Sequence, residues 1–198
     1  MTVQRKIKKL ISRTLMPMRL YKPKNKREPV LTLPVTSAWK GLELIIGDII
    51  DRFGVGRDNC IEFGVEFGYS SVVFSNFFKS VKGVDIFVGD EHTNHKGDHF
   101  ESTRAALKDY KNITLFKSDY KDWIKRDTAQ YDFAHVDIVH NYAETYECGL
   151  WAAQHSKVCI FHDTESFPEV RRAVYDIAKA TGKKVYNYRK HYGLGIIV

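Results

Sequence analysis

Short hydrophobic runs alternate along the chain with longer stretches in which hydrophobic positions recur every three or four residues. The short runs predict buried strands, and the longer stretches predict amphipathic helices. Strands alternating with helices predict crossover connections, and therefore a mostly parallel sheet with helices on both faces. The predicted strands lie near 59–63, 81–85, 112–117, 132–137 and 157–162, and the predicted helices near 37–53, 69–79, 98–110, 142–155 and 167–181.

The C-terminal end departs from this alternation. Strand-like segments at 183–189 and 193–198 follow one another with no helix between them. Two strands joined by a short loop predict an antiparallel hairpin at one edge of the sheet. The predicted fold is therefore α/β: a Rossmann-like, seven-stranded, mostly parallel sheet that ends in an antiparallel hairpin.

Basic residues are concentrated at the N-terminus. Residues 1–28 contain ten Lys or Arg and one Glu, whereas the other 170 residues contain 21 basic and 23 acidic side chains. The formal net charge of +7 therefore comes from a basic arm. The arm also carries hydrophobic residues at near-helical spacing, which predict a short amphipathic helix ending before Pro17. These residues are Ile7, Leu10, Ile11 and Leu15.

Pro23, Pro29 and Pro34 mark residues 21–36 as an irregular linker. The predicted organisation is an arm and linker at 1–36 followed by one domain at 37–198. A basic arm of this kind is expected to contact nucleic acid, an anionic membrane or an acidic partner. The alternative is a solvated extension or one that docks on another subunit of a homo-oligomer.

Length and composition restrict the class of protein. With 198 residues and 43% hydrophobic content, the chain is long enough for one substantial core. Its apolar runs are short and interrupted, and no apolar leader segment is recognised, so neither a membrane span nor a signal peptide is expected. Three cysteines are few and odd in number, which favours reduced thiols and a cytoplasmic location.

A glycine-containing segment follows the strand predicted at 59–63. Gly64 and Gly68 lie between this strand and a predicted helix, and Asp85 ends the next strand 21 residues after Gly64. A strand, a glycine turn, a helix and a later carboxylate form a nucleoside-binding layout. Glu66 lies where a dinucleotide pyrophosphate would approach, and its charge would repel phosphate. The segment therefore suits S-adenosylmethionine, a cofactor without phosphate, better than a nicotinamide dinucleotide.

Three motifs with compatible spacing support this interpretation: Glu62-x-Gly64-x-x-x-Gly68-x-Ser70, Asp137-x-x-His140-x-Tyr142 and His162-Asp163-Thr164. Together they resemble the motifs of class I S-adenosylmethionine-dependent methyltransferases, in the branch of small-molecule and sugar O-methyltransferases of the macrolide-tailoring type. The resemblance covers about residues 40–198. It implies O-methylation of a hydroxylated small molecule, with the cofactor near Glu62, Gly64, Gly68, Ser70, Asp85 and Asp119.

Some of these roles have structural alternatives. The two glycines can serve an ordinary strand-to-helix turn. Asp119 matches the family position beside the adenine, but it is also well placed to cap a helix at 120–126.

The acids and histidines after the fourth and fifth predicted strands are expected at the ligand edge of the sheet. The resemblance implies Asp137 and Asp163 as ligands of Mg²⁺, with His162 where some relatives carry a carboxylate. An imidazole shifts the preference from Mg²⁺ toward Mn²⁺ or Fe²⁺; the alternative is that His162 and Asp163 only cap the next loop. His140, with Asp137 three residues before it, is the predicted general base, because an unperturbed pKa near 6.5 suits proton abstraction around neutral pH.

The loop after the second predicted strand carries a polar cluster, interpreted as a substrate lid in preference to a metal site. Two other functions stay open at this stage. One is a nicotinamide-dependent oxidoreductase, and the other is an RNA-binding protein or RNA methyltransferase that uses the basic arm. The polar cluster in the loop after the second predicted strand consists of Glu91, His92, His95, Asp98 and His99.

Overall fold

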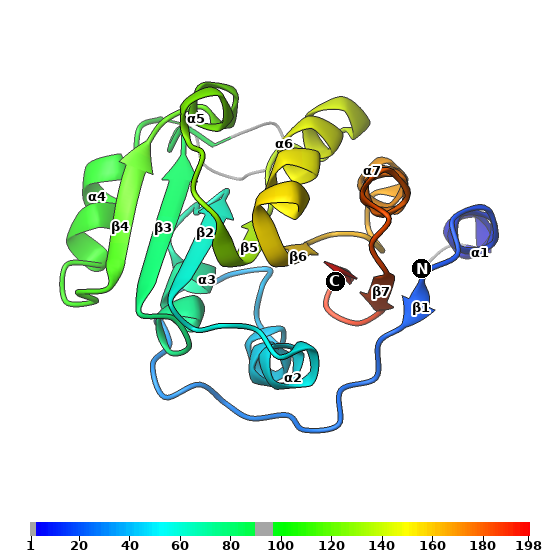
Figure 1. Ribbon diagram of the computed structural model, residues 1–198, viewed down its shortest axis with the longest axis horizontal. Helices are drawn as coiled ribbons and strands as arrows, with labels where there is room; N and C mark the ends of the chain where they lie inside the picture. The colour runs from blue at the N-terminus through cyan, green and yellow to red at the C-terminus, as the bar shows by residue number, and fades with distance from the viewer. Residues whose placement is uncertain (1–2, 90–96) are drawn as a thin grey trace.

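The computed structural model describes residues 3–89 and 97–198. One sheet, with strand order β1-β7-β8-β6-β5-β2-β3-β4, runs through the molecule and carries helices on both faces (Figure 1). The strands are β1 (Arg19–Leu20), β2 (Asn59–Phe63), β3 (Ser80–Asp85), β4 (Ile113–Lys117), β5 (Tyr131–Val136), β6 (Ser156–Phe161), β7 (Val185–Tyr188) and β8 (Leu194–Ile197). The helices are α1 (Val3–Leu15), α2 (Glu43–Phe53), α3 (Tyr69–Ser75), α4 (Phe100–Ala106), α5 (Tyr120–Arg126), α6 (Tyr142–His155) and α7 (Pro168–Thr181).

The central strands are hydrophobic on both faces because helices cover both. In β2, Cys60 packs into the core under α2 and α3, whereas Ile61 and Phe63 pack into the core under α6 and α7. Val158 and Cys159 of β6 divide between the two cores in the same way. Successive side chains of a strand point to opposite faces, so two covered faces require the continuous hydrophobic runs seen in the sequence.

The predicted architecture is confirmed. β2, β3, β4, β5 and β6 are parallel, and β8 runs antiparallel to both β6 and β7. One strand was not predicted: Arg19 and Leu20 of the arm add β1 to the edge of the sheet, parallel to β7. Two residues are too few to show an alternating pattern, so the sequence carried no signal for this strand.

Helix α2 begins later than predicted. The periodic segment starts at Ser37, but this side chain caps only a turn, in which its Oγ accepts from the Trp39 N–H at 3.1 Å. Gly41 has φ of 98°, a left-handed conformation that interrupts a right-handed helix. The regular helix therefore begins at Glu43.

The linker is irregular, as predicted, but it is held against α2. Tyr21 is buried, and its hydroxyl donates to Asp48 Oδ2 at 2.5 Å. The backbone N–H groups of Lys24 and Asn25 donate to Asp48 Oδ1 at 3.0 and 2.8 Å. The buried Asp48 carboxylate thus fixes the path of the chain between the arm and the domain.

The order of the strands reverses next to β2. From β2 the chain continues to β3 on one side, and β5 lies on the other side, paired to β2 from Cys60↔Phe133 to Phe63↔Val136. Ligands of open α/β sheets bind at such a switch point, beyond the carboxyl ends of the strands. The three cysteines are buried and free, and no helix among the described residues is long and apolar enough to span a bilayer.

Candidate active site

The segment between β2 and α3 forms a tight loop in which three residues have left-handed backbone conformations. Gly64, Glu66 and Gly68 have φ of 87°, 51° and 86°. The Gly68 N–H donates to the Val65 carbonyl at 2.8 Å and closes the turn. A Cβ on Gly64 would lie 1.8 Å from the Asp137 carbonyl oxygen, so only glycine allows this contact between the backbones of the two segments.

Asp85, at the end of β3, holds the loop in place. Its Oδ2 accepts from the backbone N–H groups of Val65 at 2.7 Å and Glu66 at 2.9 Å. Its Oδ1 accepts from the Phe87 N–H at 2.7 Å. Each carboxylate oxygen has two lone pairs, so Oδ1 retains capacity for a further donor. The contact of Asp85 with ribose hydroxyls remains a prediction. In the structure, Asp85 also holds the glycine loop through these hydrogen bonds.

Glu62 is the centre of a buried hydrogen-bond network. The hydroxyl groups of Ser70 and Ser71 donate to its two carboxylate oxygens, and His135 Nδ1 lies 2.9 Å from Oε1. On the other side of the ring, Trp39 Nε1–H donates to His135 Nε2 at 3.2 Å. Since Nε2 accepts from Trp39, the proton of the imidazole lies on Nδ1, where it is donated to Glu62. The network ties β2, β5 and the start of α3 together.

Ser70, predicted near the cofactor, is directed at Glu62 and shapes the loop from within. Three other members of the network were not among the predicted site residues: Ser71, His135 and Trp39. Glu62 and His135 are cross-strand partners of β2 and β5. This pairing is visible only once the strand order is known.

A second polar cluster lies at the carboxyl ends of β5 and β6. His140 Nε2 is 2.9 Å from Asp163 Oδ2 and 3.6 Å from Asp137 Oδ1. His162 Nδ1 is 3.0 Å from Asp137 Oδ2 and 3.5 Å from Asp163 Oδ2. Asp163 has a left-handed φ of 64°, and the ring of His140 stacks on Phe167 at 4.2 Å between centroids. The structure thus brings the predicted Asp137, His140, His162 and Asp163 together.

The charges of this cluster change the interpretation of His140. Burial alone would lower its pKa, but hydrogen bonds and attraction from Asp137 and Asp163 outweigh burial and raise the pKa to about 10. Burial likewise opposes ionisation of Asp137, yet the neighbouring His162 and His140 hold its pKa well below the usual range. The prediction from the sequence assumed an unperturbed imidazole. In the folded chain, His140 instead carries a proton at neutral pH.

The cluster fits a divalent cation. Asp137, His140 and Asp163 each offer one donor atom, and these atoms lie within 4.8 Å of one another. Two carboxylate oxygens and one imidazole nitrogen suit Mn²⁺ or Fe²⁺ as well as Mg²⁺. His162, which the sequence placed among the ligands, lies against Asp137 Oδ2 beside this group.

Asp119 caps α5, as the structural alternative had it. Its side chain accepts from the Lys121 N–H at 2.8 Å. The Ser118 N–H donates to the Asp85 carbonyl at 2.9 Å, so the cap lies next to the loop that follows β3. The predicted contact of Asp119 with the adenine therefore stays a prediction. Glu91, His92 and His95 of the proposed lid lie outside the described residues.

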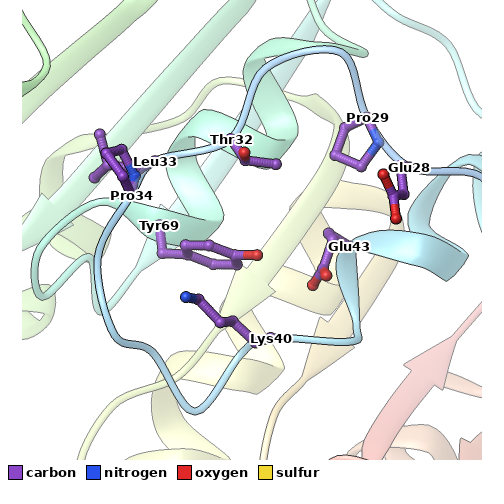
Figure 2. A pocket seen from close by; sticks show the side chains of 8 residues that line it. All are labelled: Glu28, Pro29, Thr32, Leu33, Pro34, Lys40, Glu43 and Tyr69. Carbon is purple, nitrogen blue, oxygen red and sulfur yellow. The ribbon is translucent and has the colours of Figure 1, made fainter.

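A cavity of about 280 Å³ lies between the linker and the helices α2 and α3. Figure 2 shows Tyr69, Lys40 and Glu43 directed into it beneath the linker. Burial and Glu43 raise the pKa of Tyr69 to about 12. Tyr69 directly follows the glycine loop, but none of the acids and histidines at the ends of β5 and β6 lines this cavity.

Comparison with solved structures supports the assignment of the fold. An O-methyltransferase from Bacillus cereus, solved with S-adenosylhomocysteine (SAH), shares 14% identity at a TM-score of 0.57 and covers 100% of this chain and 92% of its own. The O-methyltransferase TomG of Streptomyces achromogenes, solved with S-adenosylmethionine (SAM), shares 16% identity at 0.58 and covers 84% and 81%. The fibrillarin pre-rRNA processing protein of Methanococcus jannaschii shares 11% identity at 0.51 and covers 72% and 66%. At these identities the likeness shows a shared fold.

A search of curated proteins by sequence gave no match. The model of a methyltransferase domain family, however, matches residues 61–164, from β2 to the Thr164 that follows Asp163. The matched segment is more than half of the chain, and it contains the glycine loop, Asp85, Asp119 and the cluster at the ends of β5 and β6. The resemblance found in the sequence is confirmed, and the chain belongs to the methyltransferase domain family.

Proposed function

We propose that this protein transfers a methyl group from SAM to a hydroxyl oxygen of a small molecule. The observation that carries the proposal is the contact between the two halves of the site. Gly64 packs directly against the Asp137 carbonyl, and the Asp137 N–H donates to the Phe63 carbonyl at 2.8 Å. A cofactor on the glycine loop would therefore lie beside the acid and histidine cluster. The fold is shared with O-methyltransferases solved with SAM or SAH, which supports this choice of cofactor.

The glycine loop would bind the cofactor through its backbone. Gly64 and Gly68 let the loop pack against the Asp137 carbonyl and the Leu107 side chain, and the loop held in this way would offer its backbone groups to the amino-acid part of SAM. Asp85 offers Oδ1 to a ribose hydroxyl while Oδ2 holds the loop. Glu66 is exposed and negative, which favours a sulfonium cofactor over a pyrophosphate.

Methyl transfer is an in-line displacement. The acceptor oxygen forms a bond to the methyl carbon, the bond from that carbon to sulfur breaks, and the acceptor loses its proton. His140 and the carboxylates of Asp137 and Asp163 are the groups we assign to hold this proton. Because the two carboxylates raise the pKa of His140, the imidazole must release its proton to solvent before it can accept the proton of the acceptor hydroxyl. In the protonated state, His140 orients the acceptor by donating a hydrogen bond.

In an alternative state, the cluster would supply ligands for a divalent cation: Asp137, Asp163 and His140, once His140 Nε2 has lost its proton. A cation held there would lower the pKa of a bound hydroxyl group and ease its deprotonation. His162 would orient Asp137 from the side, since its Nδ1 lies 3.0 Å from Oδ2.

Calorimetry with SAM tests the cofactor assignment. The wild-type protein should bind SAM, and Asp85→Ala should weaken binding at least about tenfold, because the loop loses its brace. Asp122→Ala is the matched control: this acid on α5 is 71% exposed and pairs with Lys125 on the surface. Failure of the wild-type protein to bind SAM, or equal binding by Asp85→Ala, would contradict the assignment. Binding of NAD in place of SAM would favour an oxidoreductase instead.

A methylation assay tests the reaction. Hydroxylated small molecules, sugars included, are incubated with the full chain and SAM, and formation of SAH is followed together with the mass of the acceptor. The expected product is heavier by one methyl group on oxygen. Methylation of RNA with no turnover of any small molecule would contradict the proposed acceptor class while leaving the cofactor assignment intact.

A further inference from the structure

Helix α1 is attached to the domain through its polar side. The Arg13 guanidinium pairs with the buried Glu165 carboxylate, with Nη2 2.6 Å from Oε2. Ser12, the neighbour of Arg13, is only 9% exposed, and Arg171 of α7 donates to the Met16 carbonyl at 3.0 Å. Figure 1 shows α1 beside α7 at the end of the sheet that carries β1. The helix therefore has a defined orientation relative to the domain.

The apolar side of α1 faces away from the domain. Positions 7, 10, 11 and 15 follow the i, i+3, i+4, i+8 spacing that places side chains on one helical face. All four side chains are about half exposed or more: Ile7 51%, Leu10 65%, Ile11 52% and Leu15 70%.

This arrangement is the reverse of an ordinary surface helix, which buries its apolar stripe against the core. Here the contacts to the domain come from Ser12, Arg13 and the end of the helix, and the stripe is exposed. A contiguous exposed apolar surface marks a site of interaction. The stripe is therefore expected to contact a binding partner outside this chain.

Charge identifies this partner. The sequence of α1 contains no acidic residue and four Lys or Arg besides the Arg13 that pairs with Glu165: Arg5, Lys6, Lys8 and Lys9. A second copy of the same helix would bring like charges together, which is unfavourable. A protein groove could contact the stripe only if its rim were acidic, whereas an anionic lipid surface presents an apolar layer and negative headgroups together. A planar anionic surface can contact the apolar side of α1 while the polar side stays attached to α7 and Glu165.

We propose that α1 binds an anionic lipid surface and holds the protein at a membrane. The stripe of Ile7, Leu10, Ile11 and Leu15 enters the boundary between headgroups and acyl chains, and the basic residues of the arm attract anionic headgroups. Basic amphipathic helices with this distribution lie in the plane of the interface and do not span the bilayer. The proposal is independent of the assigned reaction, because it rests on α1 alone.

Vesicle flotation of the full chain tests the proposal. The vesicles contain phosphatidylcholine alone or with roughly one-third phosphatidylglycerol, so that only the second set is anionic. The wild-type protein should float with the anionic vesicles and remain unbound with the neutral ones. Binding should weaken when NaCl is raised from about 0.1 to 0.5 M, because salt screens attraction between exposed charges.

The variant Leu10→Gln/Ile11→Gln removes half of the stripe, keeps the charge and uses a residue with good helix propensity. It should lower the fraction bound to anionic vesicles at least about tenfold while leaving SAM binding unchanged. Val30→Gln is the matched control, because Val30 is a 94% exposed apolar residue outside α1. It should bind vesicles like the wild type.

Four results would overturn the proposal. The first is no binding of the wild-type protein to anionic vesicles, and the second is equal binding to neutral ones. The third is undiminished binding by the double variant, which would leave no role for the stripe. The fourth is dimerisation or RNA binding without vesicle binding. Dimers that are lost in the double variant would assign the stripe to a second copy of the chain. RNA binding that is the same in the wild type and the double variant would assign the arm to nucleic acid.

Discussion

Two carboxylates on neighbouring strands each pair with an imidazole, but their surroundings differ. Glu62 is fully buried and receives hydrogen bonds from Ser70, Ser71 and His135. Asp137, just past the end of β5, faces His140 and His162, with the second carboxylate of Asp163 beside them. The first pair is surrounded by hydroxyl and indole groups that cannot change charge near neutral pH. The second belongs to a group of four ionisable side chains.

This difference separates a structural pair from the cluster that we propose takes part in the reaction. Donors from two further segments of the chain complete the Glu62 pair: Trp39 in the turn before α2, and Ser70 and Ser71 in α3. The role of the pair is therefore to fix the shape of the glycine loop. In the cluster around Asp137, attraction to the carboxylates of Asp137 and Asp163 outweighs burial and raises the pKa of both His140 and His162. A divalent cation could bind these carboxylates, or an acceptor hydroxyl could donate a hydrogen bond to them, in place of the imidazoles. The same residue types therefore provide rigidity in one place and, in our proposal, chemistry in the other.

The largest effect is expected at His140. His140→Ala should lower methyl transfer by at least about a hundredfold, since a positioned acid or base contributes that much or more. SAM affinity should stay within about twofold of the wild type, because no contact to the glycine loop is lost. Single-turnover kinetics and calorimetry measure the two quantities. His155→Ala, a change at the other end of α6, is the matched control, and full activity in His140→Ala would remove His140 from the mechanism.

The next effect concerns the divalent cation. Mn²⁺ should bind the full chain, and Asp163→Asn should weaken binding at least about tenfold, because one of two carboxylate ligands is lost. Titration calorimetry gives this result without an acceptor, and Asp122→Asn serves as the surface control. A chelator should also lower turnover in the methylation assay. Unchanged turnover after chelation would show that the two carboxylates serve only His140 and His162.

The fold and the glycine loop could be predicted because each depends on local sequence. Strands β2 to β6 appear as hydrophobic runs, the terminal hairpin as two runs without a helix, and the loop as glycines at fixed spacing. The motif spacing also placed Asp137, His140, His162 and Asp163 at one edge of the sheet, where the structure has them. Parallel strands end at the same edge, so their order along the chain was sufficient.

The parts that could not be predicted depend on contacts between distant segments. Trp39 and His135 are 96 residues apart, and no pattern links an indole in a turn to a histidine inside a strand. The raised pKa of His140 arises from Asp137 together with Asp163, which comes from another strand end and lies 2.9 Å away. The late start of α2 depends on the left-handed Gly41, which hydrophobic periodicity does not report. In each case the property depends on the three-dimensional structure and not on the local sequence pattern.

Glu62→Gln tests the structural half of the comparison. A glutamine side chain has one carbonyl acceptor and an NH₂ donor, so it cannot receive all three hydrogen bonds. Removal of a buried acceptor should lower the free energy of unfolding by about 1–3 kcal/mol, measured by urea denaturation. Glu101→Gln, at an acid 70% exposed on α4, should change it by less than about 0.5 kcal/mol. Equal stability of the two variants would mean that the network does not hold the loop.

The smallest effect is expected at Asp48, a buried carboxylate of α2 that receives neutral donors, as Glu62 does, but from the linker. Burial raises its pKa, and hydrogen bonds from Tyr21, Asn25 and Lys24 outweigh burial and lower it. A depressed carboxyl pKa stabilises the fold above the unfolded value of about 4, and this stabilisation is lost as the pH falls through the folded value.

Tyr21→Phe removes one of these donors and keeps the ring. It should destabilise the protein by about 1 kcal/mol at pH 7 and by less at about pH 3, where the carboxyl group is protonated in more of the folded molecules. Urea denaturation at both pH values measures the difference, and Tyr192→Phe, at a 57% exposed tyrosine, is the control. A penalty that does not change with pH would mean that Tyr21 stabilises the linker through packing alone. The hydrogen bond from Tyr21 would then have no effect on the pKa of Asp48, unlike the effect of His140 and His162 on the pKa of Asp137.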